Sequence, residues 1–253
     1  MQGGRLTPGR LYVGTSGFAY QGWQASFYPA STRPAAMLAH YASILPAVEL
    51  NSTWYRAPGE GAIRGWLAAT PPGFRFAVKG QRGASLRALR GDPRQAVDRL
   101  TAPLRAFGER LGCVLLRVPA DVERSDEQLA GLLMAWPRDI PMAVEFQHPS
   151  WIVDEVLTML RLQAAALCAT ELPEDAEPPR LFLTGSFLYL RLRRHDYSAA
   201  ELEAWAARVV PFLEAGNDVY AFFRHDEHGE APLRAERLRS AVARNLGQAG
   251  ARS

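Results

Sequence analysis

The chain of 253 residues is predicted to fold as a single α/β domain, a (β/α)8 barrel of the TIM type. The main observation is a regular alternation of short apolar runs with longer amphipathic segments. The apolar runs have the length and the β-branched and aromatic content of strands. There are eight of them, at residues 11–16, 47–51, 74–80, 113–118, 142–147, 165–170, 187–192 and 219–224. Eight strands that alternate with helices favour parallel strands joined by crossovers, and eight such units close into a barrel.

The segments between the strands have apolar residues at helical spacing. They cover residues 33–45, 60–69, 94–110, 126–135, 150–163, 198–214 and 231–246. Three of them begin with a serine that is a predicted N-cap, namely Ser125, Ser150 and Ser198. Glu201 follows Ser198 at the spacing of a capping box, in which each side chain binds the backbone of the other residue.

The connection after the sixth strand breaks the alternation. Its sequence, TELPEDAEPPRLFLTGS, is rich in proline and acidic residues, so the helix expected there is short or missing. No internal repeat or linker divides the chain. The sequence therefore predicts one barrel domain over residues 1–253, with a core from about 10 to 246 and short flexible termini.

Composition restricts the classes of function. Hydrophobic residues make up 48% of the chain, enough to form a full core, and the formal net charge is only +3. The basic residues are almost all arginine, and Lys79 is the only lysine. A protein coated for nucleic-acid binding would show a larger excess or a basic run, so positive charge is expected to act locally.

The cysteines and the hydropathy pattern indicate the compartment. Cys113 and Cys168 lie far apart in apolar runs, as small buried hydrophobes do, and they match neither a disulfide framework nor a metal motif. The first residues, MQGGRLTPGR, lack the apolar core of a signal peptide. No run approaches the ~18–20 apolar residues that cross a bilayer. The sequence predicts a soluble cytoplasmic protein with no membrane partner.

The side chains of a barrel strand alternate between the interior and the helix layer. In the second strand, Val48 and Leu50 take the outward positions, which leaves Glu49 and Asn51 inward. The other strands sort in the same way, and every charged strand residue falls on the inward parity. Arg75 shares this parity but comes too early in its strand to reach the functional face.

The inward residues near the carboxyl ends of the strands form the candidate site, because barrel enzymes act at that face. They comprise two carboxylates, five cations and an amide: Glu49, Glu145, Lys79, Arg117, Arg191, Arg193, Arg224 and Asn51. Ammonium and guanidinium groups bind phosphate and carboxylate, so the excess of cations predicts a pocket for an anionic small molecule. An internal salt-bridge network across the top of the barrel is the structural alternative.

The two carboxylates allow acid/base chemistry without specifying it. Glu49 and Glu145 lie three strands apart, roughly across the mouth from each other. Glycosidases hold two carboxyl groups at roughly 5–5.5 Å for retention or roughly 6.5–9.5 Å for inversion, and either spacing fits this separation. Each glutamate could equally pair with a neighbouring cation.

A divalent metal ion is a further alternative, although no cofactor is predicted. Its ligands would be the two glutamates with His148, His225, Asp226 and His228. The sequence has no tight ligand spacing such as HExxH, and the nearby cations would oppose the charge of a metal. The segment HDEH is better interpreted as a solvated turn.

Aromatic residues are frequent in the loops after the first two strands. Rings with polar tips at a pocket rim suit stacking on a sugar or a base. Tyr55 is the better ligand candidate, whereas Trp23 and Phe27 are expected to cover the mouth of the barrel.

Several motifs make the chain resemble a known family. They are YVGTSGFAYQGW, VELNSTWYR, TPPGFRFAVKG, VEFQHPSW and YLRL, in this order. Over nearly its whole length the chain resembles the domain of unknown function 72 family, also called YecE-like. The resemblance implies a TIM-barrel-like fold with the motif residues near the mouth, and it brings no established reaction. It supports seven positions: Glu49, Asn51, Tyr55, Lys79, Glu145, His148 and Arg191.

The chain departs from the pattern of this family after three strands. Where relatives tend to have Gln and two prolines after the fourth strand, this chain has Arg117 followed by Val-Pro-Ala. Thr170 and Glu171 replace Asp-Ser after the sixth strand, and Arg224 and His225 replace Asn-Asn after the eighth. Part of the cationic excess is therefore peculiar to this chain, which implies a shifted substrate or a decayed site.

The functional prediction is an enzyme that binds a phosphorylated or carboxylated small molecule, with sugars among the candidates, at the carboxyl ends of the strands. Glu49 and Glu145 are its predicted acid/base groups, and Lys79 and Arg191 are expected to stabilise an oxyanion. The predicted substrate-binding residues are Asn51, Tyr55, Arg117, His148, Arg191, Arg193 and Arg224. A non-catalytic nucleic-acid-binding protein and a metal-dependent hydrolase or isomerase are the alternatives.

Overall fold

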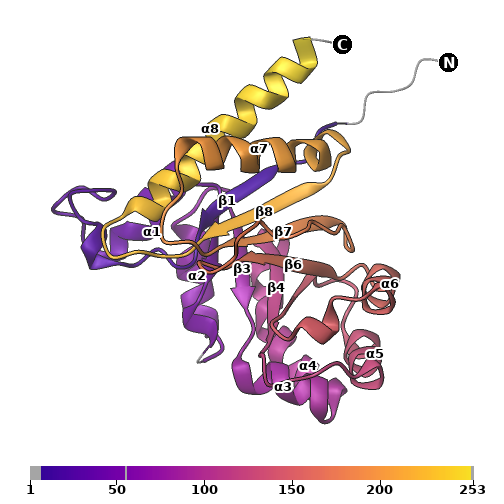
Figure 1. The fold of residues 1–253 in the computed structure, drawn as a ribbon. Helices are drawn as coiled ribbons and strands as arrows, with labels where there is room; N and C mark the ends of the chain where they lie inside the picture. The colour runs from indigo at the N-terminus through magenta and orange to yellow at the C-terminus, as the bar shows by residue number, and fades with distance from the viewer. Residues whose placement is uncertain (1–6, 55, 252–253) are drawn as a thin grey trace.

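Eight parallel strands form a nearly closed barrel in the computed structural model, which describes the backbone of residues 7–54 and 56–251 (Figure 1). The strands are β1 (Leu11–Thr15), β2 (Ala47–Leu50), β3 (Arg75–Lys79), β4 (Leu111–Val118), β5 (Met142–Phe146), β6 (Ala166–Glu171), β7 (Phe187–Leu192) and β8 (Asp218–Phe223). They hydrogen-bond in the order β1-β8-β7-β6-β5-β4-β3-β2. The predicted fold class is confirmed, with strand limits close to the predicted ones.

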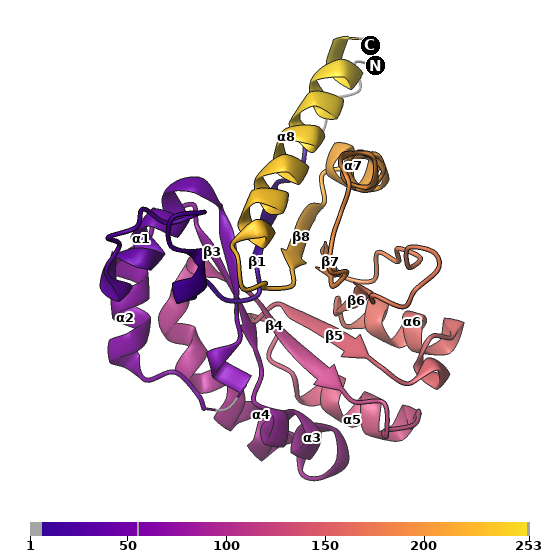
Figure 2. The same ribbon diagram turned by 60° about the vertical axis from the view of Figure 1, so that its left-hand side comes forward.

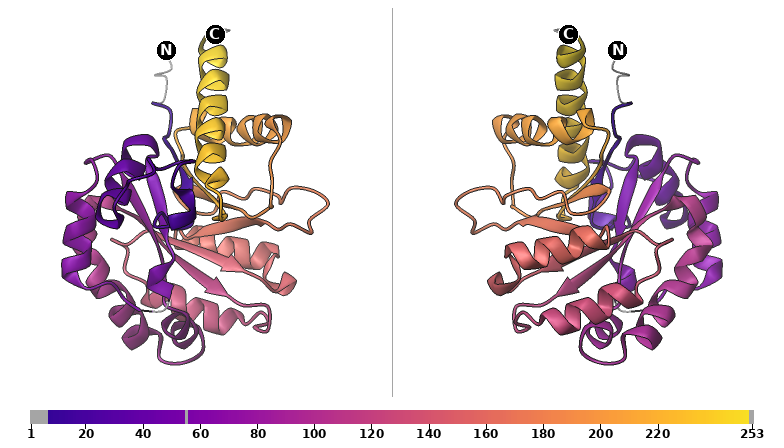
Figure 3. Two further views of the ribbon diagram at one scale, coloured as in Figure 1. Left: turned by 90° about the vertical axis from the view of Figure 1, so that its left-hand side faces the viewer. Right: turned by 90° about the vertical axis from the view of Figure 1, so that its right-hand side faces the viewer.

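Helices surround the strands, as the two orientations of Figures 1 and 2 show. They are α1 (Pro34–Ile44), α2 (Glu60–Ala68), α3 (Arg82–Arg90), α4 (Pro93–Thr101), α5 (Asp126–Ala135), α6 (Asp154–Leu162), α7 (Ala199–Glu214) and α8 (Glu230–Ala251). Short 3-10 turns are η1 (Gln21–Trp23), η2 (Ser52–Trp54), η3 (Ala102–Arg110) and η4 (Pro149–Trp151). No helix lies between β6 and β7 in the described chain, which confirms the predicted gap; Figure 3 shows the connection as a long loop.

Two details of the helix prediction are corrected by the structure. The connection from β3 to β4 begins with α3, which the sequence analysis did not predict, and Asp92 starts a separate helix after it. The Asp92 carboxylate accepts the backbone N–H groups of Arg94 and Gln95, and Pro93 fits the first helical position. Ser150 does not cap α6: Val153 holds that position, and Ser150 lies in η4, where its Oγ accepts the N–H of Arg124 at 2.9 Å. The caps at Ser125 and Ser198 are confirmed.

A tyrosine from α1 closes the barrel between β1 and β2, which share a single isolated bridge at Ser16 and Glu49. The Tyr41 hydroxyl accepts the N–H of Thr15 at 2.8 Å and donates to the carbonyl of Ala47 at 3.0 Å, so it replaces a direct strand-to-strand hydrogen bond. A Cβ at position 14 would lie 1.9 Å from the Ala47 oxygen, which explains the glycine there. The closed barrel brings β2 next to β1 and holds Glu49 at the mouth.

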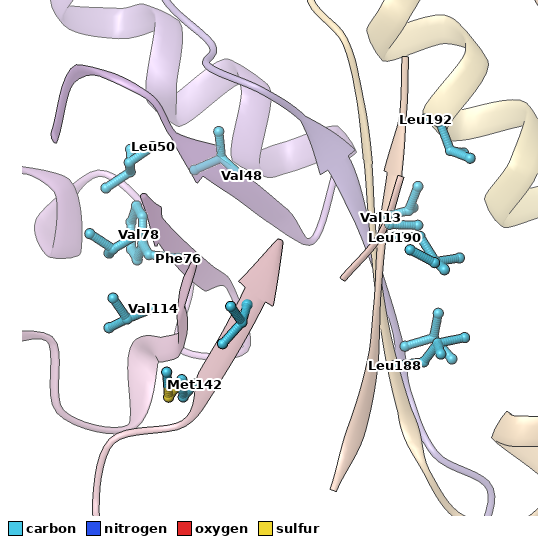
Figure 4. Packing of buried hydrophobic residues seen from close by; sticks show 14 of the residues in the cluster. Val13, Val48, Leu50, Phe76, Val78, Val114, Met142, Leu188, Leu190 and Leu192 are labelled. Carbon is cyan, nitrogen blue, oxygen red and sulfur yellow. The ribbon is translucent and has the colours of Figure 1, made fainter. Parts of the chain in front are cut away.

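The alternation of side chains divides the barrel into an outer and an inner core. Outward residues such as Val48, Phe76 and Leu190 are buried against the helices, and Figure 4 shows Leu188, Leu190 and Leu192 along one side of β7. Each such side chain contributes about 1.5–3 kcal/mol through burial. The inner core holds small and aromatic residues: Tyr12, Ala47, Ala77, Cys113, Leu115, Ala143, Ala166, Cys168, Phe187, Tyr189, Tyr220 and Phe222. The predicted parity is thus confirmed, and both cysteines are free and buried.

No helix in the described part of the chain is long and apolar enough to cross a membrane. The longest, α8, is amphipathic, and Figure 2 shows its last turns extending beyond the barrel.

Candidate functional site

Glu49, at the carboxyl end of β2, is fully buried and surrounded by donors. Its Oε1 accepts the Ser16 hydroxyl at 2.7 Å, and its Oε2 accepts the Tyr189 hydroxyl at 2.8 Å. Arg191 donates from Nε and Nη2 to the two oxygens at 3.0 and 2.9 Å, and Arg193 Nη2 lies 3.4 Å from Oε1. Both oxygens of this carboxylate are thus engaged with protein donors, and Arg191 compensates its charge.

Arg191, on β7, links both glutamates of the predicted site. While Nε and Nη2 bind Glu49, Nη1 donates to both oxygens of Glu145 at 2.9 and 2.8 Å. Burial lowers the pKa of Arg191, but the charges of Glu49 and Glu145 together outweigh this effect. The pKa of Arg191 therefore lies above that of an ordinary arginine. We call Glu49, Arg191 and Glu145 the inner triad. Because each member is at most 4% exposed at its side chain, the three charges depend on one another for compensation.

Glu145 receives two further contacts at the edge of the inner triad. The Thr170 hydroxyl donates to its Oε1 at 2.7 Å. Arg117 Nε lies 3.1 Å from its Oε2, yet Nε has no hydrogen-bond partner in the described structure, so the contact is an ion pair without good angular alignment. The guanidinium of Arg117 is therefore less constrained than that of Arg191.

A cavity of about 420 Å³ opens above the inner triad, at the carboxyl ends of the strands. Its lining residues are Tyr20, Asn51, Trp54, Lys79, Arg117, Glu145, Gln147, Thr170, Leu172, Pro173, Arg191, Arg193, Arg224 and His225. Five of them are lysine or arginine and one is a carboxylate, and Glu49 does not reach the cavity. We call Lys79, Arg117, Arg193 and Arg224 the outer cations.

Lys79 has no acidic partner, unlike Arg117, Arg191 and Arg193. All Asp and Glu residues lie in the described part of the chain, and none forms an ion pair with it. Its Nζ lies 4.3 Å from the ring centroid of Trp54, in a cation–π contact. Burial lowers the pKa of Lys79, and the charges of Arg191 and Arg117 lower it further against the opposing effect of the two glutamates.

The rim of the cavity carries an amide and two stacked rings. Asn51 Oδ1 is buried and has no hydrogen-bond partner within the described residues, so an acceptor is available at the cavity wall. Tyr20 and His225 stack with their centroids 4.9 Å apart. Burial raises the pKa of Tyr20 to about 12, and burial together with Arg224 lowers the pKa of His225. Both rings are therefore neutral at neutral pH.

A second cavity, of about 550 Å³, lies where β5 and β6 separate. These strands share only two register pairs, Ala143 with Ala166 and Val144 with Leu167. No helix follows β6, so the loop toward β7 covers this side of the sheet beside α6, whose Asp154 and Leu157 also line the cavity. Four residues line both cavities, namely Glu145, Gln147, Thr170 and Leu172, which makes the two spaces neighbours.

The structure brings most of the predicted site residues together. Seven of them line the first cavity: Asn51, Lys79, Arg117, Glu145, Arg191, Arg193 and Arg224. Glu49 lies beneath it, and Tyr55 is outside the described residues. His148 does not line the cavity; its Nδ1 lies 2.8 Å from Ser150 Oγ and accepts the backbone N–H of Ser150. Its ring therefore stabilises the turn η4.

Sequence analysis missed three contributors. Ser16 and Tyr189 bind Glu49, and Trp54 faces Lys79. Parity already placed Tyr189 inward, but nothing in the sequence indicated that its hydroxyl reaches β2. The salt-bridge network considered as an alternative describes the inner triad well. Lys79 and Arg224, which form no ion pair among the described residues, lie outside it.

The residues considered for a metal ion do not converge. Within the described chain, no group of three or more His, Cys, Asp or Glu side chains is arranged to hold one. The Asp226 carboxylate instead accepts the backbone N–H groups of residues 228–231 at 2.5–3.0 Å, where α8 begins. The HDEH segment is therefore a helix-capping turn.

The sequence and the structure of the chain are both similar to those of known proteins. The sequence profile of the family described as "Protein of unknown function DUF72" matches residues 12–252, nearly the whole chain. The protein belongs to the DUF72 family. The chain is also similar to the UPF0759 protein YunF of Bacillus subtilis (strain 168), with 24% identity over 87% of this chain and 90% of YunF.

Solved structures of DUF72 proteins share the fold. A crystal structure of a DUF72 protein from Thermotoga maritima MSB8 superposes with a TM-score of 0.80 at 28% identity, covering 92% of this chain and 99% of the other. A DUF72 protein from Enterococcus faecalis V583 gives a TM-score of 0.75 at 20% identity, over 92% and 95% of the two chains, which shows the fold alone.

Proposed function

We propose that this DUF72 protein is an enzyme whose substrate is a small molecule with a phosphate or carboxylate group, bound at the carboxyl ends of the barrel strands. One observation carries the proposal: five cations line a cavity that contains a single carboxylate, and two of them, Lys79 and Arg224, form no ion pair among the described residues. Like charges held close together oppose folding unless an opposite charge compensates them. An anionic ligand would supply that compensation.

The cavity is suited to such a ligand in size and in chemistry. Its volume of about 420 Å³ falls within the range of small-molecule sites, about 300–1,000 Å³. Arg117 and Arg224 offer planar donor forks, Lys79 offers a compact ammonium, and the free acceptor of Asn51 suits a hydroxyl or amine of the ligand. A phosphorylated sugar or a hydroxylated carboxylic acid combines these features.

The two glutamates receive different roles in this proposal. Glu145 lines the cavity and remains the acid/base candidate. Glu49 acts as a positioning residue, because it does not line the cavity and it holds Arg191 and Arg193 in place. Glycoside hydrolysis is disfavoured, since the guanidinium of Arg191 fills the space between the carboxylates where the sugar would react.

Thermal-shift measurements at constant ionic strength test this function. The ligands are inorganic phosphate, glucose 6-phosphate and citrate, with glucose as the uncharged control. Saturation at about 100 Kd adds about 2.7 kcal/mol, which for a chain of this size raises Tm by about 5–10 °C. Arg224→Met is expected to weaken phosphate binding about tenfold through the loss of a charge-assisted contact. Arg105→Met, at an exposed pair with Asp139, is the matched control and leaves binding unchanged.

Each outcome decides between the proposal and its alternatives. No stabilisation by any anion, or equal stabilisation by glucose, would overturn the proposal. The nucleic-acid alternative requires a short single-stranded oligonucleotide to bind more tightly than phosphate, with an affinity that falls steeply with salt. Stabilisation only in the presence of Mg²⁺, Mn²⁺ or Zn²⁺ would favour the metal-dependent alternative.

A further inference from the structure

No other cation of the site combines the three features of Lys79. It is the only lysine of the chain, it ends β3 at the wall of the cavity, and it has no acidic partner. A lysine that served only to neutralise Glu49 or Glu145 would pair with one of them. Those two carboxylates are bound by Arg191 instead, and Lys79 faces the cavity beside Trp54.

The environment of Lys79 increases the fraction of its uncharged amine. Burial and the charges of Arg191 and Arg117 lower the pKa of Lys79, so more of it is neutral at physiological pH than for an ordinary lysine. Only the neutral amine carries a lone pair that can attack an electrophile. Desolvation and a neighbouring cation are the two means by which proteins activate lysine as a nucleophile.

We propose that Lys79 forms an imine with the carbonyl carbon of the ligand, which makes an anionic aldehyde or ketone, such as a 2-oxo acid or a phosphorylated ketose, the substrate class of this site. This inference rests on the proposed function, because the outer cations must first bind the anionic group. Arg117 and Arg224 line the same cavity as Lys79, so an anion bound to them brings its neighbouring atoms to the lysine.

The step is a condensation that needs no further reactant. The Nζ lone pair forms a bond to the carbonyl carbon, and a proton moves from nitrogen to oxygen to give a carbinolamine. Loss of the oxygen as water, with both amine hydrogens, leaves a carbon–nitrogen double bond. Protonation of that nitrogen makes the adjacent carbon electron-poor. The positive charge of the protonated imine lies on Nζ, beside the Trp54 ring.

Reductive trapping tests the inference directly. The protein is incubated with pyruvate, dihydroxyacetone phosphate or acetone in the presence of borohydride, and intact masses and peptides are measured. A trapped imine adds the mass of the carbonyl compound less one oxygen atom. Because the α-amino group is the only other amine of the chain, the site is read without ambiguity. We expect pyruvate or the phosphorylated ketone to label Lys79 on the order of tenfold faster than acetone, and excess phosphate to protect it.

A variant separates the roles of charge and of nucleophile. Lys79→Arg keeps the positive charge and should still bind phosphate in the thermal-shift assay, but it should give no adduct within the cavity. Labelling confined to the α-amino group, or unaffected by phosphate, would overturn the imine. If phosphate stabilises the protein and no carbonyl compound reacts at Lys79, this inference fails while the proposed function stands. If no anion binds, both fail.

Discussion

Two layers of charge lie in the same barrel mouth and are compensated in opposite ways. In the inner triad, Arg191 is shared between Glu49 and Glu145, and each member is at most 4% exposed at its side chain. In the layer above, Lys79 and Arg224 face a cavity and form no ion pair with any described carboxylate. The charges of the inner triad are compensated without a ligand, whereas those of Lys79 and Arg224 are not.

The difference separates a structural role from the binding role proposed for the outer cations. A buried arginine between two carboxylates fixes the distance between β2, β5 and β7, and it forms the floor of the cavity. Neighbouring cations without partners add nothing to stability, and burial lowers the pKa of one of them, Lys79, which disfavours its charged form. Perturbed groups of this kind concentrate at functional sites.

Removal of the central guanidinium is expected to have the largest effect. Arg191→Met leaves two buried carboxylates facing each other, and breaking a buried pair in this way costs about 3–5 kcal/mol. Urea unfolding, with the free energy extrapolated to water, measures the loss. Arg191→Lys keeps the charge but loses the bidentate contacts, and should recover only part of it.

The control for this experiment is Arg105→Met, which removes an exposed arginine and should change stability by less than about 1 kcal/mol. If Arg191→Met were no more damaging than this control, the inner triad would not be a structural element.

Substituting each glutamate by glutamine compares how much Glu49 and Glu145 contribute to the free energy of unfolding. Glu49→Gln places an NH₂ group among the donors of Ser16, Tyr189 and Arg191, and should cost about 2–3 kcal/mol. Glu145→Gln should cost less, because Glu145 borders the cavity and its new NH₂ group can face water there. The same unfolding assay compares them. A larger effect at Glu145 would reverse the proposed division between a positioning and a cavity-facing glutamate.

Much of this arrangement was predictable from the sequence because strand parity is local. The inward placement of Glu49, Lys79, Arg117 and Arg191 follows from alternation alone, given eight parallel strands. The missing helix after β6 followed equally from the prolines of that segment. Local sequence was thus enough to predict the strands, the side chains that point into the barrel and the set of charged groups among them.

Which of these charged groups pair with one another was not predictable from the sequence. The pairing depends on the height of each side chain along the barrel axis and on its direction, and the whole barrel sets both. Arg191 and Arg193 share one face of β7, and only the stagger of β2 and β5 against β7 decides which of them is central. The closure of the barrel by the Tyr41 hydroxyl is likewise a contact between distant segments. His148 lies in a family motif, but a local contact with Ser150 turns its ring to the turn η4.

In the outer layer, substitutions should separate binding from stability. Lys79→Met and Arg117→Met are expected to change the free energy of unfolding by no more than about 0.5 kcal/mol, because neither side chain is buried between opposite charges. Under the proposed function, each lowers phosphate affinity about tenfold. Calorimetric titration with phosphate measures the affinity, and urea unfolding measures the free energy of unfolding. Loss of stability without loss of affinity would assign these cations to the structural layer.

The smallest expected effect is a pH dependence that Lys79 alone contributes. Its pKa in the folded protein lies below the ordinary value of 10.5, so the unfolded chain binds more protons between these two pKa values. Stability must therefore rise with pH through that window, by linkage. Lys79→Met should lack this rise, and the difference in unfolding free energy between the two proteins, followed from neutral pH to about 10.5, isolates it. Saturating phosphate should weaken the rise, because a bound anion stabilises the ammonium and raises the pKa of Lys79. A difference that ran downward with pH would mean that the folded protein stabilises the charged lysine, as the inner triad stabilises Arg191, and the contrast between the two layers would disappear.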